Sequence, residues 1–92
     1  MPTACARHIL VKTKEEAETL KNQLANGADF ASLAMKKSLC NTAKKGGNLG
    51  EFSPGKMVKS FDNIVFKKPL LKVHGPVKTK FGFHLIETIY RS

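Results

Sequence analysis

Cysteine, tryptophan, arginine and long apolar runs are all scarce or absent in this chain. The 92 residues include two cysteines and no tryptophan. Two thiols are too few for a disulfide scaffold, and no stretch approaches the roughly 18 consecutive apolar residues of a membrane-spanning helix. The first residues also lack the basic segment and apolar run of a secretory signal. We therefore expect a cytoplasmic protein with free thiols and no membrane segment.

Acidic residues are few as well, because 7 Asp and Glu stand against 16 Lys and Arg, for a net charge of +9. A basic surface attracts anionic partners, nucleic acid included. However, only Arg7 and Arg91 are arginines, and arginine is the side chain that phosphate and base recognition favours. No strand interleaves aromatic and basic residues as single-strand binders do. We interpret the lysines as a solubilising coat and keep a nucleic-acid-binding module as an alternative function.

The apolar content is nevertheless sufficient for one folded domain over residues 1–92. Leu, Ile, Val and Phe supply 24 of the 92 residues, above the level of about 20% that is typical of disorder. The chain contains no repeats, no low-complexity stretch and no linker longer than a loop. No pattern typical of a dimer interface is present, so we expect a monomer.

The hydrophobic pattern predicts strands at both ends of the chain and helices between them. Residues 4–11 and 83–90 are apolar, β-branched segments, and as the most apolar strands they should form the centre of the sheet. In the second segment, alternation places His84, Ile86, Thr88 and Tyr90 on one face. The remaining predicted elements are helices at about 14–26, 30–37 and 58–67, a loop with one helical turn at 38–48, a strand fragment at 49–52, a kinked or edge strand at 71–77 and a hairpin turn at 78–82.

This order predicts an α+β fold with a mostly antiparallel sheet. Thr13 and Glu16 form a capping box before the first helix, and Asp29 is placed to cap the second. Gly75-Pro76 interrupts the strand at 71–77, because proline cannot donate to a ladder and is confined to edge strands or bulges.

Few titratable residues lie close to apolar sequence. His8 and His84 each occur within a predicted central strand, so the two imidazoles could share one face of the sheet. Taken singly, each is more often a hydrogen-bonded structural histidine. Cys40 as a nucleophile beside a histidine is possible chemistry. Cys5 and His8 have the spacing of a metal-ligand pair, but a strand directs them to opposite faces, so we expect no metal site and no cofactor.

Seven short segments, taken together, resemble the parvulin family of peptidyl-prolyl cis/trans isomerases, especially its small stand-alone bacterial members. Each segment is weak evidence alone, whereas their order and spacing cover almost the whole chain. They are ARHILV (6–11), GADF (27–30), SLC (38–40), GGNLGEF (46–52), GKMV (55–58) with Phe61, GPV (75–77) and FGFHLI (81–86).

The resemblance implies a four-stranded antiparallel sheet surrounded by about four helices, in the order βα3βαβ2. It implies that His8 and His84 are paired histidines on neighbouring central strands, with Cys40 beside them as the third catalytic residue. It also implies that Leu49, Met57 and Phe61 form a pocket for the proline ring. Phe52, Thr79 and Phe81 match positions at the edge of that site.

The expected activity is rotation about X–Pro bonds in proline-containing peptides and unfolded proteins, without covalent catalysis. Other parvulins carry Asp at the Cys40 position, which argues against an obligatory thiol mechanism. A His8–His84 hydrogen bond, with Thr79 or Thr88 as a partner, would organise the site. Lys12 and Lys14 stand where phosphate-dependent parvulins have a long loop with paired arginines, so we expect phosphate-independent activity with an apolar residue before proline. The alternatives are a proline-peptide-binding chaperone and the basic nucleic-acid-binding module.

Overall fold

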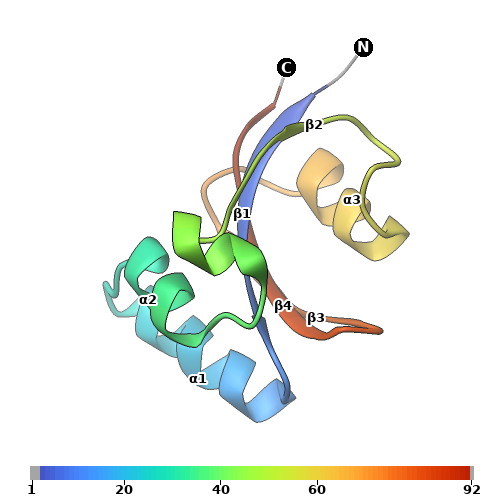
Figure 1. The fold of residues 1–92 in the computed structure, drawn as a ribbon. Helices are drawn as coiled ribbons and strands as arrows, with labels where there is room; N and C mark the ends of the chain where they lie inside the picture. The colour runs from blue at the N-terminus through green and yellow to red at the C-terminus, as the bar shows by residue number, and fades with distance from the viewer. Residues whose placement is uncertain (1–2, 92) are drawn as a thin grey trace.

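The computed structural model describes residues 3–91, which form a four-stranded antiparallel sheet with helices on both faces (Figure 1). The elements are, in chain order, β1 (Ala4–Val11), α1 (Lys14–Ala25), α2 (Phe30–Lys37), the 3₁₀ helix η1 (Asn41–Lys45), β2 (Asn48–Phe52), α3 (Lys59–Lys67), β3 (Val73–Thr79) and β4 (Gly82–Arg91). The strand order is β2-β1-β4-β3, so the first and last strands occupy the centre as predicted. The α+β fold class is confirmed, and the about four expected helices correspond to three α-helices and one 3₁₀ helix in the described chain.

The helix boundaries follow from local capping. The Thr13 hydroxyl accepts a hydrogen bond from the backbone N–H of Glu16 at 3.1 Å, and the Asp29 carboxylate accepts one from Ser32 at 2.9 Å. These bonds satisfy backbone donors that a helix N-terminus otherwise leaves unpaired. Among residues 3–91, no helix is both long and apolar enough to cross a bilayer.

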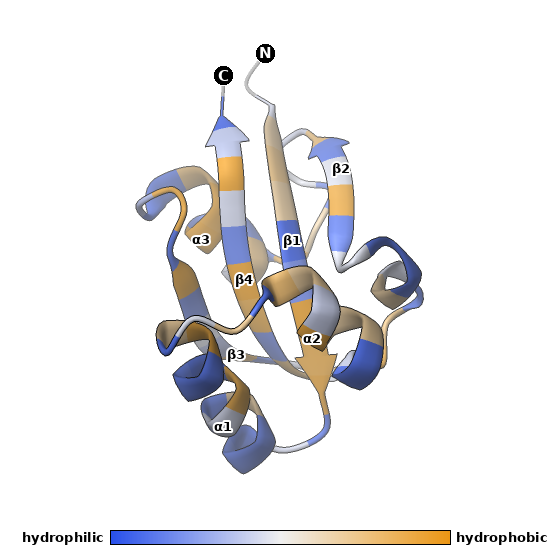
Figure 2. Cartoon of the chain, turned by 90° about the vertical axis from the view of Figure 1, so that its left-hand side faces the viewer, coloured by the Kyte–Doolittle hydropathy of each residue, from blue (hydrophilic) through white to orange (hydrophobic). Residues whose placement is uncertain are grey.

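Two apolar clusters cover the two faces of the sheet, and Figure 2 shows apolar residues along the central strands β1 and β4. On one face, α1 and α2 pack against Ile9, Val11 and Leu85. On the other, α3 packs Phe61 and Val65 against a cluster with Ala4, Ala6, Phe52 and Ile86. The second face also carries His8 and His84, so the site lies beside the smaller helical layer.

A β-bulge changes the expected face of one residue near the end of β4. Ala6 pairs with Thr88 but Cys5 pairs with Tyr90, which leaves Ile89 as an extra residue in β4. The extra residue turns Tyr90 to the face of Cys5, where its hydroxyl donates to the carboxylate of Glu51. The prediction that Tyr90 shares a face with His84 is therefore wrong, because a bulge shifts the alternation by one residue.

The first and last described strands run side by side over their whole length. Ala4 pairs with Arg91 at one end of the sheet and Val11 pairs with Phe83 at the other. The first and last residues of the sheet, Ala4 and Arg91, therefore lie side by side at one edge of the molecule (Figure 1).

Candidate active site

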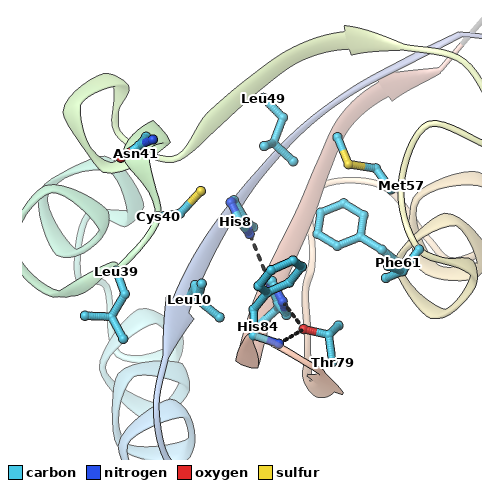
Figure 3. A pocket seen from close by; sticks show the side chains of 12 residues that line it. His8, Leu10, Leu39, Cys40, Asn41, Leu49, Met57, Phe61, Thr79 and His84 are labelled. Carbon is cyan, nitrogen blue, oxygen red and sulfur yellow. Dashed lines mark hydrogen bonds between the residues drawn. The ribbon is translucent and has the colours of Figure 1, made fainter.

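Two buried histidines on the central strands form the floor of the site. His8 on β1 and His84 on β4 are 4% and 5% exposed. Their Nδ1 atoms are 3.0 Å apart, and the planes of the two rings are nearly parallel, with an interplanar angle of 15° (Figure 3). The ring of Phe61 meets both imidazoles edge-on, at centroid distances of 5.7 and 5.8 Å. The histidines therefore lie between the sheet and an aromatic wall from α3.

A threonine bonds the outer nitrogen of each imidazole. His84 Nε2 is 2.8 Å from Thr79 Oγ1, and His8 Nε2 is 3.2 Å from Thr42 Oγ1. A hydrogen bond between two Nδ1 atoms requires one ring to donate and the other to accept. The donating ring then accepts at Nε2 from its threonine, while the accepting ring donates there. The four side chains thus form one series of hydrogen bonds, in which the tautomer of one histidine determines the tautomer of the other.

The histidine pair is held in its neutral form. Burial lowers the pKa of His8 to about 4, and the neighbouring His84 contributes in the same direction. Burial also lowers the pKa of His84. At neutral pH neither ring carries a charge, so the Nδ1–Nδ1 contact is a hydrogen bond between neutral groups.

One glycine allows a loop to approach β1 closely enough to support His8. Gly47 has φ of 84° and its carbonyl accepts from the His8 backbone N–H at 3.0 Å. A Cβ at this position would lie 2.3 Å from the His8 carbonyl oxygen. The glycine therefore lets η1, which carries Thr42, lie directly against the histidine strand.

Above the histidines is a cavity of about 410 Å³. Its walls come from β1, the segment before η1, the start of β2, the loop before α3 and the β3–β4 turn (Figure 3). The lining includes no Lys, Arg, Asp or Glu and consists of His8, Leu10, Leu39, Cys40, Asn41, Leu49, Met57, Val58, Phe61, Thr79, Phe81 and His84. An apolar cavity of this size fits a small apolar ring and its neighbouring side chain.

The Cys40 thiol reaches the cavity without joining the histidine chain. Within residues 3–91 the thiol makes no hydrogen bond to either imidazole. The backbone N–H of Cys40 donates to Ser38 Oγ at 3.4 Å. An activated thiol nucleophile needs a base within hydrogen-bond reach. No group of three or more His, Cys, Asp or Glu side chains in the described part of the chain could hold a metal ion.

The model of the PPIC-type PPIase domain matches residues 3–91. The chain belongs to this family of peptidyl-prolyl isomerase domains.

Relatives and solved structures agree with this assignment. The chain is 47% identical over 88 residues to "Foldase protein PrsA" of Exiguobacterium sibiricum, which covers 94% of this chain and 29% of that protein. It is 44% identical over 86 residues to the "Parvulin-like PPIase" of Rickettsia bellii, with coverage of 89% and 30%. The chain thus spans about a third of the length of these curated relatives.

Two structures show the same fold. PrsA from Bacillus anthracis superposes with a TM-score of 0.95 at 34% identity, covering 99% of this chain and 42% of that chain. NmPin, the parvulin of Nitrosopumilus maritimus, superposes with a TM-score of 0.87 at 37% identity, covering 98% of both chains. The predicted resemblance to parvulins is confirmed.

The structure of this PPIase domain brings together eight of the nine predicted site residues. His8, Cys40, His84, Leu49, Met57, Phe61, Thr79 and Phe81 all line the cavity. Phe52 does not, because it is 9% exposed and packs against Phe61 and Phe66 in the core behind the cavity. The proposed roles of these residues stay predictions.

Of the two threonines predicted as possible histidine partners, Thr79 is confirmed, because it bonds His84, and Thr88 is wrong. Thr88, offered as a partner of the histidines, is fully buried elsewhere and bonds the carbonyl of Val65. Thr42 takes that place for His8, and its only signal in the sequence is that it follows Cys40 by two residues. The lining residues not predicted are Leu10, Leu39, Asn41 and Val58.

Proposed function

We propose that this PPIase domain accelerates rotation about X–Pro bonds in flexible or unfolded protein segments, without a covalent intermediate. The observation that carries this proposal is an uncharged cavity placed directly over a neutral, hydrogen-bonded histidine pair. Such a cavity can hold a proline ring, and the Cys40 thiol that faces it makes no hydrogen bond to either imidazole in the described structure.

The chemistry of the reaction suits an apolar enclosure. Rotation about a peptide bond meets a barrier of about 18–20 kcal/mol because the amide loses its resonance. The twisted amide is less polar than the planar one, so a cavity that excludes water disfavours the planar form more. Leu49, Met57 and Phe61 would hold the ring while the preceding carbonyl turns. Each tenfold acceleration requires about 1.4 kcal/mol of such discrimination.

The polar groups would organise this site. The Thr42–His8–His84–Thr79 chain fixes both imidazole orientations, which keeps the floor rigid and neutral. Cys40 would lie near the turning carbonyl and tune the local field through its polarisable sulfur. Preorganised dipoles of this kind act without reorganising during the reaction.

The residue before proline would be apolar and would need no phosphate. Leu10 and Leu39 lie on the other side of His8 from Met57 and Phe61 (Figure 3). Phe81 is 63% exposed and Leu39 is 56% exposed at the rim of the same cavity. These side chains offer an apolar surface beside the proline pocket, where a phosphate would find no arginine pair to bind it.

We also propose that the domain works as a monomer in a reducing compartment such as the cytoplasm, away from membranes. The two cysteines support the compartment, because both are free thiols in the described chain and persistent free thiols are typical of reducing compartments. Light scattering on the purified protein and fractionation of cells would test both statements. A stable dimer or a membrane-bound pool would contradict them.

The activity is tested by cis/trans exchange NMR on an Ala-Leu-Pro-Phe peptide with catalytic amounts of protein. Wild type is compared with Met57→Ala, which shortens a side chain in the proline pocket, and with Met35→Ala as a matched control. Met35 lies on α2, is 62% exposed and is not in the cavity lining. We expect wild type and Met35→Ala to accelerate exchange equally and Met57→Ala to lose about tenfold, which corresponds to about 1.4 kcal/mol of lost transition-state binding.

Three outcomes would contradict the proposal or one of its parts. Peptide binding by a folded protein without acceleration would indicate a proline-peptide-binding chaperone. A large rate gain with phosphoserine in place of leucine would contradict phosphate independence. Equal activity of Met57→Ala and Met35→Ala would remove Met57 from the binding site.

A further inference from the structure

A second cavity adjoins the cavity above the two histidines and has a different chemistry. It has a volume of about 420 Å³ and is built by η1 and the start of β2. Asn41 and Leu49 line both cavities. The other lining residues are Thr42, Lys45, Asn48 and Gly50. Because the two cavities share a wall, a peptide whose proline lies in the first can place a nearby side chain in the second.

The second cavity is rich in hydrogen-bond donors and carries positive charge. Lys45 is its cation, and neither ion pair among residues 3–91 involves this lysine, since they join Arg7 to Glu87 and Lys14 to Glu18. Asn48 Oδ1 already accepts from the Gly50 backbone N–H at 2.7 Å. Its Nδ2 group is therefore the part of this amide left to donate to a ligand.

Negatively charged side chains are absent from the same lining, which includes no Asp or Glu among the described residues. Glu51 follows the lining residue Gly50, but its carboxylate accepts from the Tyr90 hydroxyl on the face of Cys5. Lys45 thus has no internal carboxylate partner in the described structure.

We propose that this cavity is a subsite for an acidic side chain, Asp or Glu, that flanks the X–Pro bond of a peptide substrate. The inference rests on the proposed isomerase function and adds to it a preference at a second substrate position. The first cavity takes the apolar X–Pro pair, and the second takes a carboxylate that Lys45 and the Asn48 amide bind.

The expected kinetic signature is specific. A carboxylate in the second cavity lies outside the cavity that holds the rotating bond. It therefore contacts Lys45 equally in the planar and the twisted amide. Such uniform binding lowers KM and leaves kcat unchanged. For a solvent-accessible lysine–carboxylate pair we expect a two- to fivefold gain in kcat/KM, which should shrink as salt screens the charges.

The test uses paired peptides that keep the Ala-Leu-Pro-Phe core and carry Glu or Gln at one flanking position at a time. Exchange NMR over a range of peptide concentrations gives KM and kcat for each pair. The proteins are wild type, Lys45→Met and the matched control Lys44→Met. Lys44 is the preceding residue of η1 and does not line the cavity. The measured quantity is the Glu/Gln ratio of kcat/KM within each protein.

We expect one flanking position at which wild type and Lys44→Met prefer Glu through KM, and Lys45→Met does not. Equal turnover of Glu and Gln peptides at every position in wild type would overturn the subsite while leaving the isomerase function intact. The same loss in Lys44→Met and Lys45→Met would also overturn it, because general surface charge would then explain the preference. Absence of turnover with the Gln peptides would instead contradict the isomerase function itself.

Discussion

Acidification should destabilise this PPIase domain through the buried histidine pair. In the folded domain the pKa of His8 is lowered from 6.5 to about 4, mainly by burial. Between these values the unfolded chain binds a proton that the folded chain does not. Stability is therefore fully present above pH 6.5 and falls as the pH drops toward 4.

The size of the effect follows from the two pKa values. At pH 4.5 the unfolded His8 is almost fully protonated and the folded one is mostly neutral. Linkage then gives a loss of about 2 to 3 kcal/mol relative to pH 7.5. His84 contributes in the same direction, because burial lowers its pKa too. For a domain of this size, with a urea m-value of about 1 kcal/mol/M, the midpoint should shift by about 2 to 3 M.

The assay is urea unfolding at pH 7.5 and pH 4.5 for wild type and His8→Gln. The variant removes the titrating ring but keeps a neutral polar side chain facing His84. It should be less stable at pH 7.5 and lose about 2 to 3 kcal/mol less than wild type on acidification. Carboxylates such as Asp29, whose pKa is lowered by hydrogen bonds from Ser32, affect both proteins alike and cancel in the comparison. Parallel losses in the two proteins would refute the reasoning.

Three further predictions concern single side chains around the site. Cys40→Ser should retain measurable isomerase activity in the exchange assay, since the thiol bonds neither imidazole in the described structure; complete loss with the fold intact would contradict non-covalent catalysis. Thr42→Val should cost about 1–3 kcal/mol in urea unfolding, because His8 Nε2 loses its partner in a buried site, and an unchanged midpoint would show that the bond is not needed. Gly47→Ala should cost more than about 1 kcal/mol, because its Cβ would overlap the His8 carbonyl; a variant as stable as wild type would contradict the close approach of this loop.

Much of the fold could be predicted because local signals coincide with the element boundaries. Thr13 and Asp29 cap the first two α-helices at the expected residues. The apolar segments at the two ends of the chain became the central strands. Pro76 indicated the edge strand, and β3 is at the edge of the sheet with a register shift between His74 and Val77. In each case a property of a few neighbouring residues was sufficient.

The errors arise where the answer depends on residues far apart in the chain. The face of Tyr90 depends on how β4 aligns with β1, and one extra residue reverses it. Phe52 and Leu49 belong to the same short strand, yet only Leu49 reaches the cavity. Thr42 is bonded to His8 because the glycine loop folds against β1. Hydrophobic alternation contains none of this cross-strand and cross-loop information.

The pairing of Ala4 with Arg91 has a consequence for how such a domain can be used. A domain whose first and last residues are adjacent can be inserted into a surface loop of another protein without separating the two parts of that protein. The cavity opens among the turn after β3, the loop before α3 and the segment leading into η1, none of which is an end of the chain. An insertion would therefore leave the mouth of the cavity open. The matching region occupies 29% of the PrsA protein of Exiguobacterium sibiricum and 42% of the PrsA chain of Bacillus anthracis, so a domain with this fold occurs within longer chains.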